Sequence, residues 1–191
     1  MHVLVTGGAG YIGSTAVDIL LSQGYKISVL DDCSTGHADS VSAGIDFVHG
    51  SILNNEDVAK ALHGCDAVMH FAGKSLVGES VKQPDLYREV NVAGTRILLD
   101  VMRKSGIKKL VFSSSAATYG EPKQVPILED APTQPTNPYG ETKLEIDQMI
   151  SAEAYSRGLA AVSLRYFNVA GAHESKRGWL AERHNPETHL I

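Results

Sequence analysis

The stretch Thr6-Gly7-Gly8-Ala9-Gly10-Tyr11-Ile12-Gly13 decides the fold of this chain. It joins a short apolar run, residues 3–6, to a segment with helical periodicity, residues 11–23. Its spaced glycines allow a tight turn and a close approach of the backbone to a pyrophosphate, and the helix that follows offers free N–H groups to phosphate. A glycine-rich turn alone is common, but its position after a strand favours a phosphate cradle. The candidate phosphate-binding residues are Gly7, Gly10, Tyr11, Ile12 and Gly13.

Short β-rich runs alternate with helical segments along the rest of the chain. Strands are predicted at 3–6, 26–30, 46–49, 67–71, 109–114 and 160–165. Intervening helices impose parallel pairing, and glycines at 24, 64, 106 and 158 mark left-handed helix ends. This order predicts an α/β fold, a doubly wound, Rossmann-type parallel sheet of about six strands with helices on both faces. Its ligand crevice would lie at the carboxyl ends of the strands, where the winding reverses.

Composition narrows the function classes. The 191 residues carry a formal net charge of -5, with 43% hydrophobic and 20% charged residues, which is typical of a globular protein and gives no basic footprint for nucleic acid. No run is long enough to span a membrane. Cys33 and Cys65 cannot form a disulfide framework, which favours a reducing, cytoplasmic location. The histidines are scattered, so no metal site is expected.

Two further strand ends indicate which dinucleotide would bind. The second predicted strand ends at Asp31 and Asp32, where a carboxylate can accept hydrogen bonds from ribose hydroxyls. A 2′-phosphate would meet an anion there with no arginine nearby, so NAD is favoured over NADP. Small residues in Phe71-Ala72-Gly73 would let the backbone pass close to a flat cofactor. The alternative in both places is an ordinary turn.

Tyr139 and Lys143 form a candidate proton-transfer pair. Asn137 suits an N-cap and Pro138 the first helical position, so Tyr139 and Lys143 would lie one turn apart on one helix face. The ammonium and the helix N-terminus are then expected to lower the pKa of the phenol. Taken alone, the spacing also fits an amphipathic helix with an exposed lysine.

Serines end the fifth predicted strand at the same sheet edge as the glycine loop. Within Ser113-Ser114-Ser115, the hydroxyl of Ser115 would face the crevice, beside the phenol of Tyr139. Ser113, directly before it, is a candidate cofactor contact. A hydrogen-bond donor, a phenol and a cation are thus expected beside the cofactor site.

Six motifs together resemble the extended short-chain dehydrogenase/reductase superfamily and, within it, the UDP-glucose 4-epimerase family. They are Thr6-Gly7-Gly8-Ala9-Gly10-Tyr11-Ile12-Gly13, His70-Phe71-Ala72-Gly73, Val77-Gly78-Glu79-Ser80, Ser113-Ser114-Ser115-Ala116, Pro138-Tyr139-Gly140-x-x-Lys143 and Leu164-Arg165-Tyr166-Phe167-Asn168. The resemblance implies NAD-dependent inversion at C4 of a UDP-hexose through a 4-keto intermediate. Open alternatives are another nucleotide sugar, such as a UDP-N-acetylhexosamine or a UDP-pentose, and a catalytically inactive dinucleotide-binding fragment.

The resemblance also implies residue roles. Tyr139 would be the base, Ser115 the partner of the sugar oxygen, and Lys143 a ligand of the nicotinamide ribose. Phe167 and Asn168 would line cofactor and substrate. Related dehydratases place Asp-Glu after the catalytic hydroxyl residue, where this chain has Ala116 and Ala117, so dehydration is disfavoured.

Some positions depart from the family pattern. Ser51 stands where an aspartate is common, so the expected adenine contacts of Ser51 and Ile52 are less secure, and Ser75 and Val90 also differ. Family members run well over a hundred residues further. The resemblance therefore implies that residues 1–168 form the NAD-binding domain and that 169–191 lead irregularly toward an absent substrate domain.

The helices expected near 91–104 and 139–157 carry apolar residues on more than one side. In the family these helices pair across a two-fold axis, so a homodimer is expected. The alternative is that these residues only face the sheet.

Overall fold

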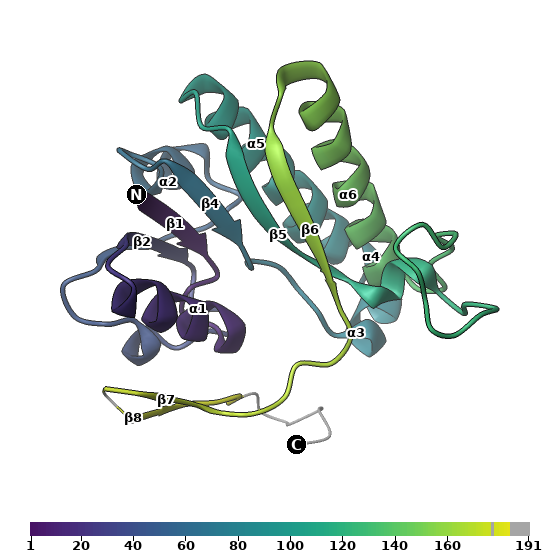
Figure 1. Ribbon diagram of the computed structural model, residues 1–191, viewed down its shortest axis with the longest axis horizontal. Helices are drawn as coiled ribbons and strands as arrows, with labels where there is room; N and C mark the ends of the chain where they lie inside the picture. Colours follow the sequence, from purple (N-terminus) through teal and green to yellow (C-terminus); the bar gives the residue numbers. More distant parts are fainter. Residues whose placement is uncertain (177, 184–191) are drawn as a thin grey trace.

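Six parallel strands form one sheet in the order β3-β2-β1-β4-β5-β6. They are β1 (His2–Thr6), β2 (Lys26–Asp31), β3 (Asp46–His49), β4 (Ala67–His70), β5 (Lys109–Ser115) and β6 (Ala160–Tyr166). This computed structural model describes residues 1–176 and 178–183 (Figure 1). Each strand lies within one residue of its predicted bounds. The winding reverses between β1 and β4, which confirms the doubly wound, Rossmann-type prediction.

The helices follow the predicted order. They are α1 (Tyr11–Ser22), α2 (Asn55–Ala61), α3 (Val77–Lys82), α4 (Pro84–Tyr87), α5 (Gly94–Lys104) and α6 (Pro138–Arg157). Short turns η1 (Ala38–Ser40), η2 (Arg88–Ala93) and η3 (Ala116–Tyr119) complete the set. A π-helical turn, η2, joins α4 directly to α5, so the helix expected from 91 begins earlier, in α4. The glycines at 24, 64, 106 and 158 all have positive φ, as predicted for helix ends.

Two apolar layers hold helices against the two faces of the sheet (Figure 1). Val3 and Val5 of β1 point to the layer that includes Val17 of α1, whereas Leu4 points to the layer under α2, α5 and α6. This alternation along β1 is what a strand buried on both faces requires. The largest side chains of the second layer include Leu98 of α5, which is fully buried. The packing fixes the carboxyl ends of β1, β4 and β5 along one edge.

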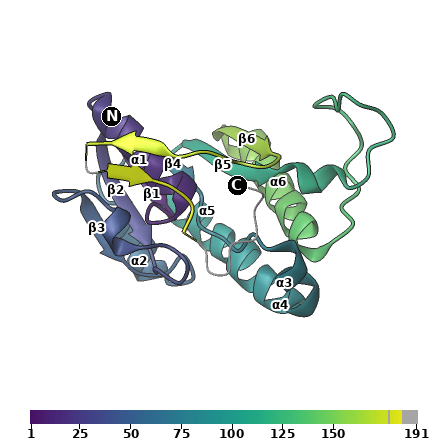
Figure 2. The same cartoon turned by 90° about the horizontal axis from the view of Figure 1, so that it is seen from below.

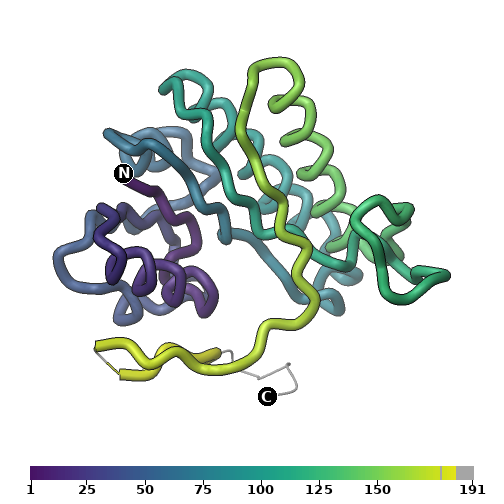
Figure 3. Tube along the Cα trace, in the orientation of Figure 1, coloured from purple at the N-terminus to yellow at the C-terminus, as the bar shows by residue number. Residues whose placement is uncertain are grey.

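The chain after β6 returns to the first half of the molecule (Figures 1 and 3). A short antiparallel hairpin, β7 (His173–Ser175) and β8 (Gly178–Leu180), differs from the irregular segment expected for 169–191. Strands of only three residues carry too little periodicity for a sequence pattern to reveal them. The hairpin lies beside α1 (Figure 2), where His173 Nε2 and Asp18 Oδ2 are 2.9 Å apart. Residues 184–191 of the expected irregular segment lie outside the described residues.

The proline-rich loop and the lengths of the helices also agree with the sequence. Residues 121–137 contain neither helix nor strand, as their prolines predicted. Within residues 1–176 and 178–183, no helix is both long enough and apolar enough to cross a membrane.

Candidate functional site

The glycine loop after β1 is packed against backbone on two sides. A Cβ at Gly7, where φ is +72°, would lie 2.6 Å from the Ala72 amide nitrogen, and one at Gly13 would lie 2.1 Å from the Gly7 carbonyl oxygen. Gly10 differs, because its Cβ would meet nothing closer than 3.4 Å. Gly10 also begins α1 without any side-chain cap. The first N–H groups of the helix are therefore available to an anion, as a phosphate cradle requires.

Asp31, at the end of β2, fastens this loop. Its Oδ2 accepts a hydrogen bond from the Ala9 N–H at 2.9 Å, and its Oδ1 accepts one from the Cys33 N–H at 2.8 Å. Burial raises the pKa of this carboxyl, although both backbone hydrogen bonds oppose the rise. Asp32 is exposed; its carboxylate accepts from the Ser34 N–H at 2.9 Å, and its carbonyl oxygen lies 3.2 Å from His49 Nε2. The two neighbouring carboxylates thus differ in position: one braces the cradle and the other faces solvent.

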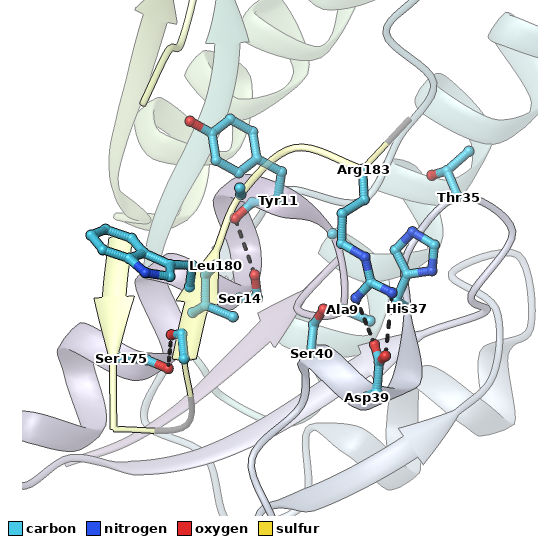
Figure 4. A pocket seen from close by; sticks show the side chains of 14 residues that line it. Ala9, Tyr11, Ser14, Thr35, His37, Asp39, Ser40, Ser175, Leu180 and Arg183 are labelled. Carbon is cyan, nitrogen blue, oxygen red and sulfur yellow. Dashed lines mark hydrogen bonds and ion pairs between the residues drawn. The ribbon is translucent and has the colours of Figure 1, made fainter. Parts of the chain in front are cut away.

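The segment after β6 adds a wall to the glycine loop that the sequence did not predict. A cavity of about 110 Å³ lies between them and is lined by Gly10 and Tyr11, by Arg183, and by residues after β2 such as His37 (Figure 4). The Tyr11 hydroxyl donates to the Gly171 carbonyl oxygen, and Arg183 pairs with Asp39 at 2.9 and 3.2 Å. These contacts join residues more than a hundred positions apart, so no local pattern could indicate them.

The three serines that end β5 each lie against a different residue of α6. The Ser113 carbonyl oxygen accepts from Lys143 Nζ at 2.8 Å. The Ser114 hydroxyl donates to Asp147 Oδ2 at 3.0 Å. Ser115 lies close enough to the phenol of Tyr139 to lower the pKa of that phenol, so the structure brings these two predicted site residues together.

The start of α6 is held as its sequence predicted. Asn137 caps the helix by accepting from the Gly140 N–H at 2.9 Å, and Pro138 takes the first helical position. The Tyr139 N–H donates to the buried Ser80 hydroxyl at 3.2 Å, a role that the sequence reasoning missed. Lys143 Nζ lies 5.8 Å from the centre of the Tyr139 ring. Tyr139 and Lys143 therefore share one helix face at the carboxyl end of β5.

The expected lowering of the Tyr139 pKa is wrong for this chain. Burial raises the pKa of Tyr139, and the nearby hydroxyl of Ser115 only partly opposes this. Burial also lowers the pKa of Lys143 to about 8. The physical reason is desolvation, which disfavours the phenolate and the ammonium alike. The expectation considered the ammonium and the helix N-terminus, but not the burial of the phenol.

A buried hydrogen-bonded chain through His70 links the carboxyl ends of β1 and β4 to α5, whereas the sequence predicted only scattered histidines. His70 Nδ1 lies 2.6 Å from the Thr6 hydroxyl oxygen, and its Nε2 lies 2.9 Å from that of Thr95. Because the Thr95 hydroxyl donates to the Asn91 carbonyl oxygen, it accepts from Nε2–H, and Nδ1 accepts from Thr6. Burial lowers the pKa of His70 to about 3, so the ring is neutral.

Asn91, in the π-helical turn η2, clamps the loop that follows β4. Its Oδ1 accepts from the Lys74 N–H at 2.8 Å, and its Nδ2 donates to the Lys74 carbonyl at 3.0 Å and to the Thr142 hydroxyl at 3.1 Å. A Cβ at Gly73, where φ is +154°, would lie 2.9 Å from Asn91 Oδ1. Asn91 is 2% exposed, and its partners Lys74 and Thr142 lie 17 and 51 positions away, so no local pattern indicated its role.

Residues 3–186 match the NAD dependent epimerase/dehydratase family. The chain belongs to this family. It is 55% identical to the UDP-glucose 4-epimerase of Halalkalibacterium halodurans, with 100% of this chain and 57% of that protein covered. It is 52% identical to the UDP-glucose 4-epimerase of Streptomyces lividans, with 98% of this chain and 57% of that protein covered. The chain thus spans between half and two thirds of the length of these curated relatives.

Solved structures of the family have the same fold. The UDP-glucose 4-epimerase of Brucella ovis in complex with NAD superposes with a TM-score of 0.94 at 46% identity. The match covers 99% of this chain and 58% of that chain.

The remaining residues that the family resemblance suggested lie at the same sheet edge. Ser51, after β3, donates its N–H to Asp57 Oδ2 at 3.0 Å, and Ile52 is buried against Gly94. Phe167 and Asn168 follow β6 and are exposed, Phe167 by 68%. Among the residues that the structure describes, no three metal-ligating side chains come together.

The apolar residues that suggested a dimer are mostly committed to the core. Leu98, Val101 and Met102 of α5, with Ile146 and Ile150 of α6, are at most 4% exposed. Ile97 and Met149 are partly buried against the same cluster. The alternative that these residues face the sheet therefore holds for most of them, and the homodimer stays a prediction.

Proposed function

We propose that this chain binds NAD and carries the proton-transfer residues of a UDP-glucose 4-epimerase. The observation that carries the proposal is the juxtaposition of Tyr139 and Ser115 with a glycine cradle on the same edge of one parallel sheet. The names of the relatives support the reaction, and the Brucella ovis structure, which is a complex with NAD, supports the cofactor.

The residues present fit NAD. The uncapped start of α1 and the space at Gly10 suit a pyrophosphate, and the carboxylates at the end of β2 suit a ribose. The proposed NAD-binding residues are Gly7, Gly10, Tyr11, Ile12, Gly13, Asp31, Asp32, Ser51, Ile52, Phe71, Ala72, Gly73, Ser113, Tyr139, Lys143 and Phe167. Bound NAD would supply the hydride acceptor and donor that inversion at C4 of a sugar needs.

The side chains of the chain would handle the proton. Tyr139 takes the proton of the sugar 4-hydroxyl and later returns it, while Ser115 and Asn168 hold the substrate. Because burial raises the pKa of Tyr139, the phenolate requires positive charge nearby. Lys143 provides one such charge, and the positive nicotinamide would add another. NAD binding is therefore expected to lower the pKa of Tyr139.

Elimination of water from the sugar is not proposed. Ala116 and Ala117 follow Ser115 in η3, and neither side chain can donate or accept a proton. The dehydratase branch of the family would need an acid and a base in these places.

Narrower questions need a substrate panel. A UDP-N-acetylhexosamine or a UDP-pentose is the second candidate substrate, because the residues at the sheet edge determine the type of reaction more than they determine which sugar binds.

Pairing of two copies through α5 and α6 and a cytoplasmic location are further proposals. The partly buried Ile97 and Met149 support the first, and the free thiols of Cys33 and Cys65 support the second.

The test is conversion of UDP-galactose to UDP-glucose by the purified chain with NAD. Tyr139→Phe is expected to lower kcat by about 10²- to 10⁴-fold and to change the Kd for NAD by about two-fold at most. Tyr155→Phe is the matched control, because Tyr155 lies on the same helix and is 96% exposed. Undiminished turnover by Tyr139→Phe would contradict the mechanism. NAD binding without turnover in the parent chain would favour a binding module.

A further inference from the structure

Asp147 lies one helical turn after Lys143, and both side chains are buried, at 7% and 5% exposure. Consecutive residues of β5 hold them: Lys143 Nζ donates to the Ser113 carbonyl at 2.8 Å, and Asp147 Oδ2 accepts from the Ser114 hydroxyl at 3.0 Å. The two opposite charges therefore face the same strand end. Nothing in the motifs of the sequence assigned Asp147 a role.

The carboxylate of Asp147 is only half satisfied. Oδ2 also accepts from Arg165 Nε at 3.2 Å, whereas Oδ1 is a buried atom with no hydrogen-bond partner among the described residues. A purely structural ion pair between Arg165 of β6 and Asp147 of α6 would account for the contacts of Oδ2, but not for the burial of Oδ1. A buried, unpartnered carboxylate oxygen is costly unless positive charge lies nearby.

The charged and titratable groups around the pair come from four elements. Tyr139 is on the same helix, and His70 of β4 is close enough for Lys143 to lower its pKa. Arg165 of β6 lies between Asp147 and Tyr119 of η3, with its guanidinium 4.8 Å from the Tyr119 ring centre. His70 is neutral, so among the described residues Lys143 and Arg165 are the cations beside Asp147.

The contacts of Lys143 are few for a buried ammonium. Besides the Ser113 carbonyl, its Nζ contacts two aromatic rings, with the ring centres of Phe112 and Tyr139 at 4.8 and 5.8 Å. Burial lowers the pKa of Lys143, and the charge of Asp147 opposes this. A lysine with this little support depends on its counter-charge to stay protonated.

We propose that Asp147 is a positioning residue that keeps the Lys143 ammonium protonated beside Tyr139, and that Arg165 limits how strongly it does so. The inference deepens the proposed function, on which it rests for the use made of the ammonium. Asp147→Asn should make Lys143 lose its proton at lower pH. Arg165→Gln should make Lys143 lose its proton at higher pH. It removes the other cation beside Asp147, so the carboxylate then stabilises the Lys143 ammonium more strongly.

The test follows the Lys143 side chain directly, by NMR titration of the chain with ¹³Cε-labelled lysine. The Lys143 signal is assigned by its absence in Lys143→Met. Asp147→Asn is expected to lower the titration midpoint by about one pH unit or more, and Arg165→Gln to raise it. Asp147→Glu, which keeps the charge, should return the midpoint toward that of the parent chain. Midpoints that do not move, or that fall in both Asp147→Asn and Arg165→Gln, would overturn the proposal.

A matched control separates this effect from a general loss of charge on α6. Glu153→Gln removes an acid of the same helix that pairs with Arg103 and Arg157, and it should leave the midpoint unchanged. If Asp147→Asn does not fold, the upward shift in Arg165→Gln still decides the matter, because a midpoint that stays or falls there contradicts the proposal.

The titration needs neither NAD nor a sugar, so its outcome is independent of the proposed function. Midpoint shifts of the expected signs in a chain without turnover would refute the proposed activity and leave the role of Asp147 intact. Turnover in a chain whose Lys143 midpoints do not move would overturn the role of Asp147 and leave the proposed activity intact.

Discussion

The two halves of the sheet edge are built in different ways. The half around β1, α1 and β2 works through backbone groups and missing side chains, with Gly7 and Gly13 in direct contact with backbone atoms. The half around β5 and α6 works through buried polar side chains, above all Lys143 and Asp147. The first half is constrained by steric fit and the second by charge. Substitutions in the first are therefore expected to be costly, whereas one in the second can increase stability.

Gly13→Ala is the strongest way to break the first half. Its Cβ would lie 2.1 Å from the Gly7 carbonyl oxygen, and backbone on both sides cannot move away cheaply. We expect the free energy of unfolding to fall by about 3 kcal/mol or more, and NAD binding to fall below detection. Urea denaturation and isothermal titration calorimetry measure the two effects.

Gly78→Ala is the control for this substitution. Gly78 lies in α3, and a Cβ there would meet nothing within 4 Å. Replacing it should leave NAD binding unchanged and should stabilise the helix slightly, if at all. An equal loss of stability in both variants would show that the contact between Gly13 and Gly7 does not matter.

Acidification tests the residue that joins the two halves. The pKa of His70 is about 3 in the folded chain, below the ordinary value of 6.5, so the unfolded chain binds more protons between these values. Stability is therefore constant with respect to this group above pH 6.5 and falls as the pH drops toward 3. The slope is about 1.4 kcal/mol per pH unit, or about 3 kcal/mol lost by pH 4.

The variant His70→Gln should remove that part of the slope. His63→Gln is the control, because His63 is exposed and should leave the slope as it is. Carboxylates also titrate in this range, so the difference between the two variants is the relevant quantity. Identical pH dependence of unfolding in His70→Gln and the parent chain would argue against a neutral, buried His70.

The comparison explains what the sequence could predict. The position of the glycine loop between β1 and α1, the cap at Asn137 and the strand bounds depend on neighbouring residues, and each was predicted correctly. The roles of Ser80, Asn91 and Asp147 depend on contacts between elements far apart in the chain. The sign of the Tyr139 pKa shift was wrong because burial is a property of the packed protein.

Lys143→Met tests whether charge limits stability in the second half. The pKa of Lys143 is about 8 when folded and 10.5 when unperturbed, so the cost of burying its charge is present below pH 8 and is relieved as the pH rises to 10.5. We expect Lys143→Met to unfold at higher urea concentration at pH 7, with about 2 kcal/mol of added stability after loss of the bond to Ser113. Lys82→Met, at an exposed site, should change little. A destabilised Lys143→Met with unchanged pH dependence would contradict this account.

Gly10→Ala should have the smallest effect on folding. It separates the role of the glycine loop in NAD binding from its role in stability. Its Cβ would come no closer than 3.4 Å to the Gly7 carbonyl oxygen, which is ordinary contact, and φ is negative there. The free energy of unfolding is therefore expected to change by less than about 0.5 kcal/mol. The same Cβ would occupy the space through which a pyrophosphate reaches the start of α1, so the Kd for NAD should rise by about ten-fold or more. Calorimetry of NAD binding beside urea denaturation separates the two quantities, and a variant that binds NAD as the parent does would show that the phosphates lie elsewhere.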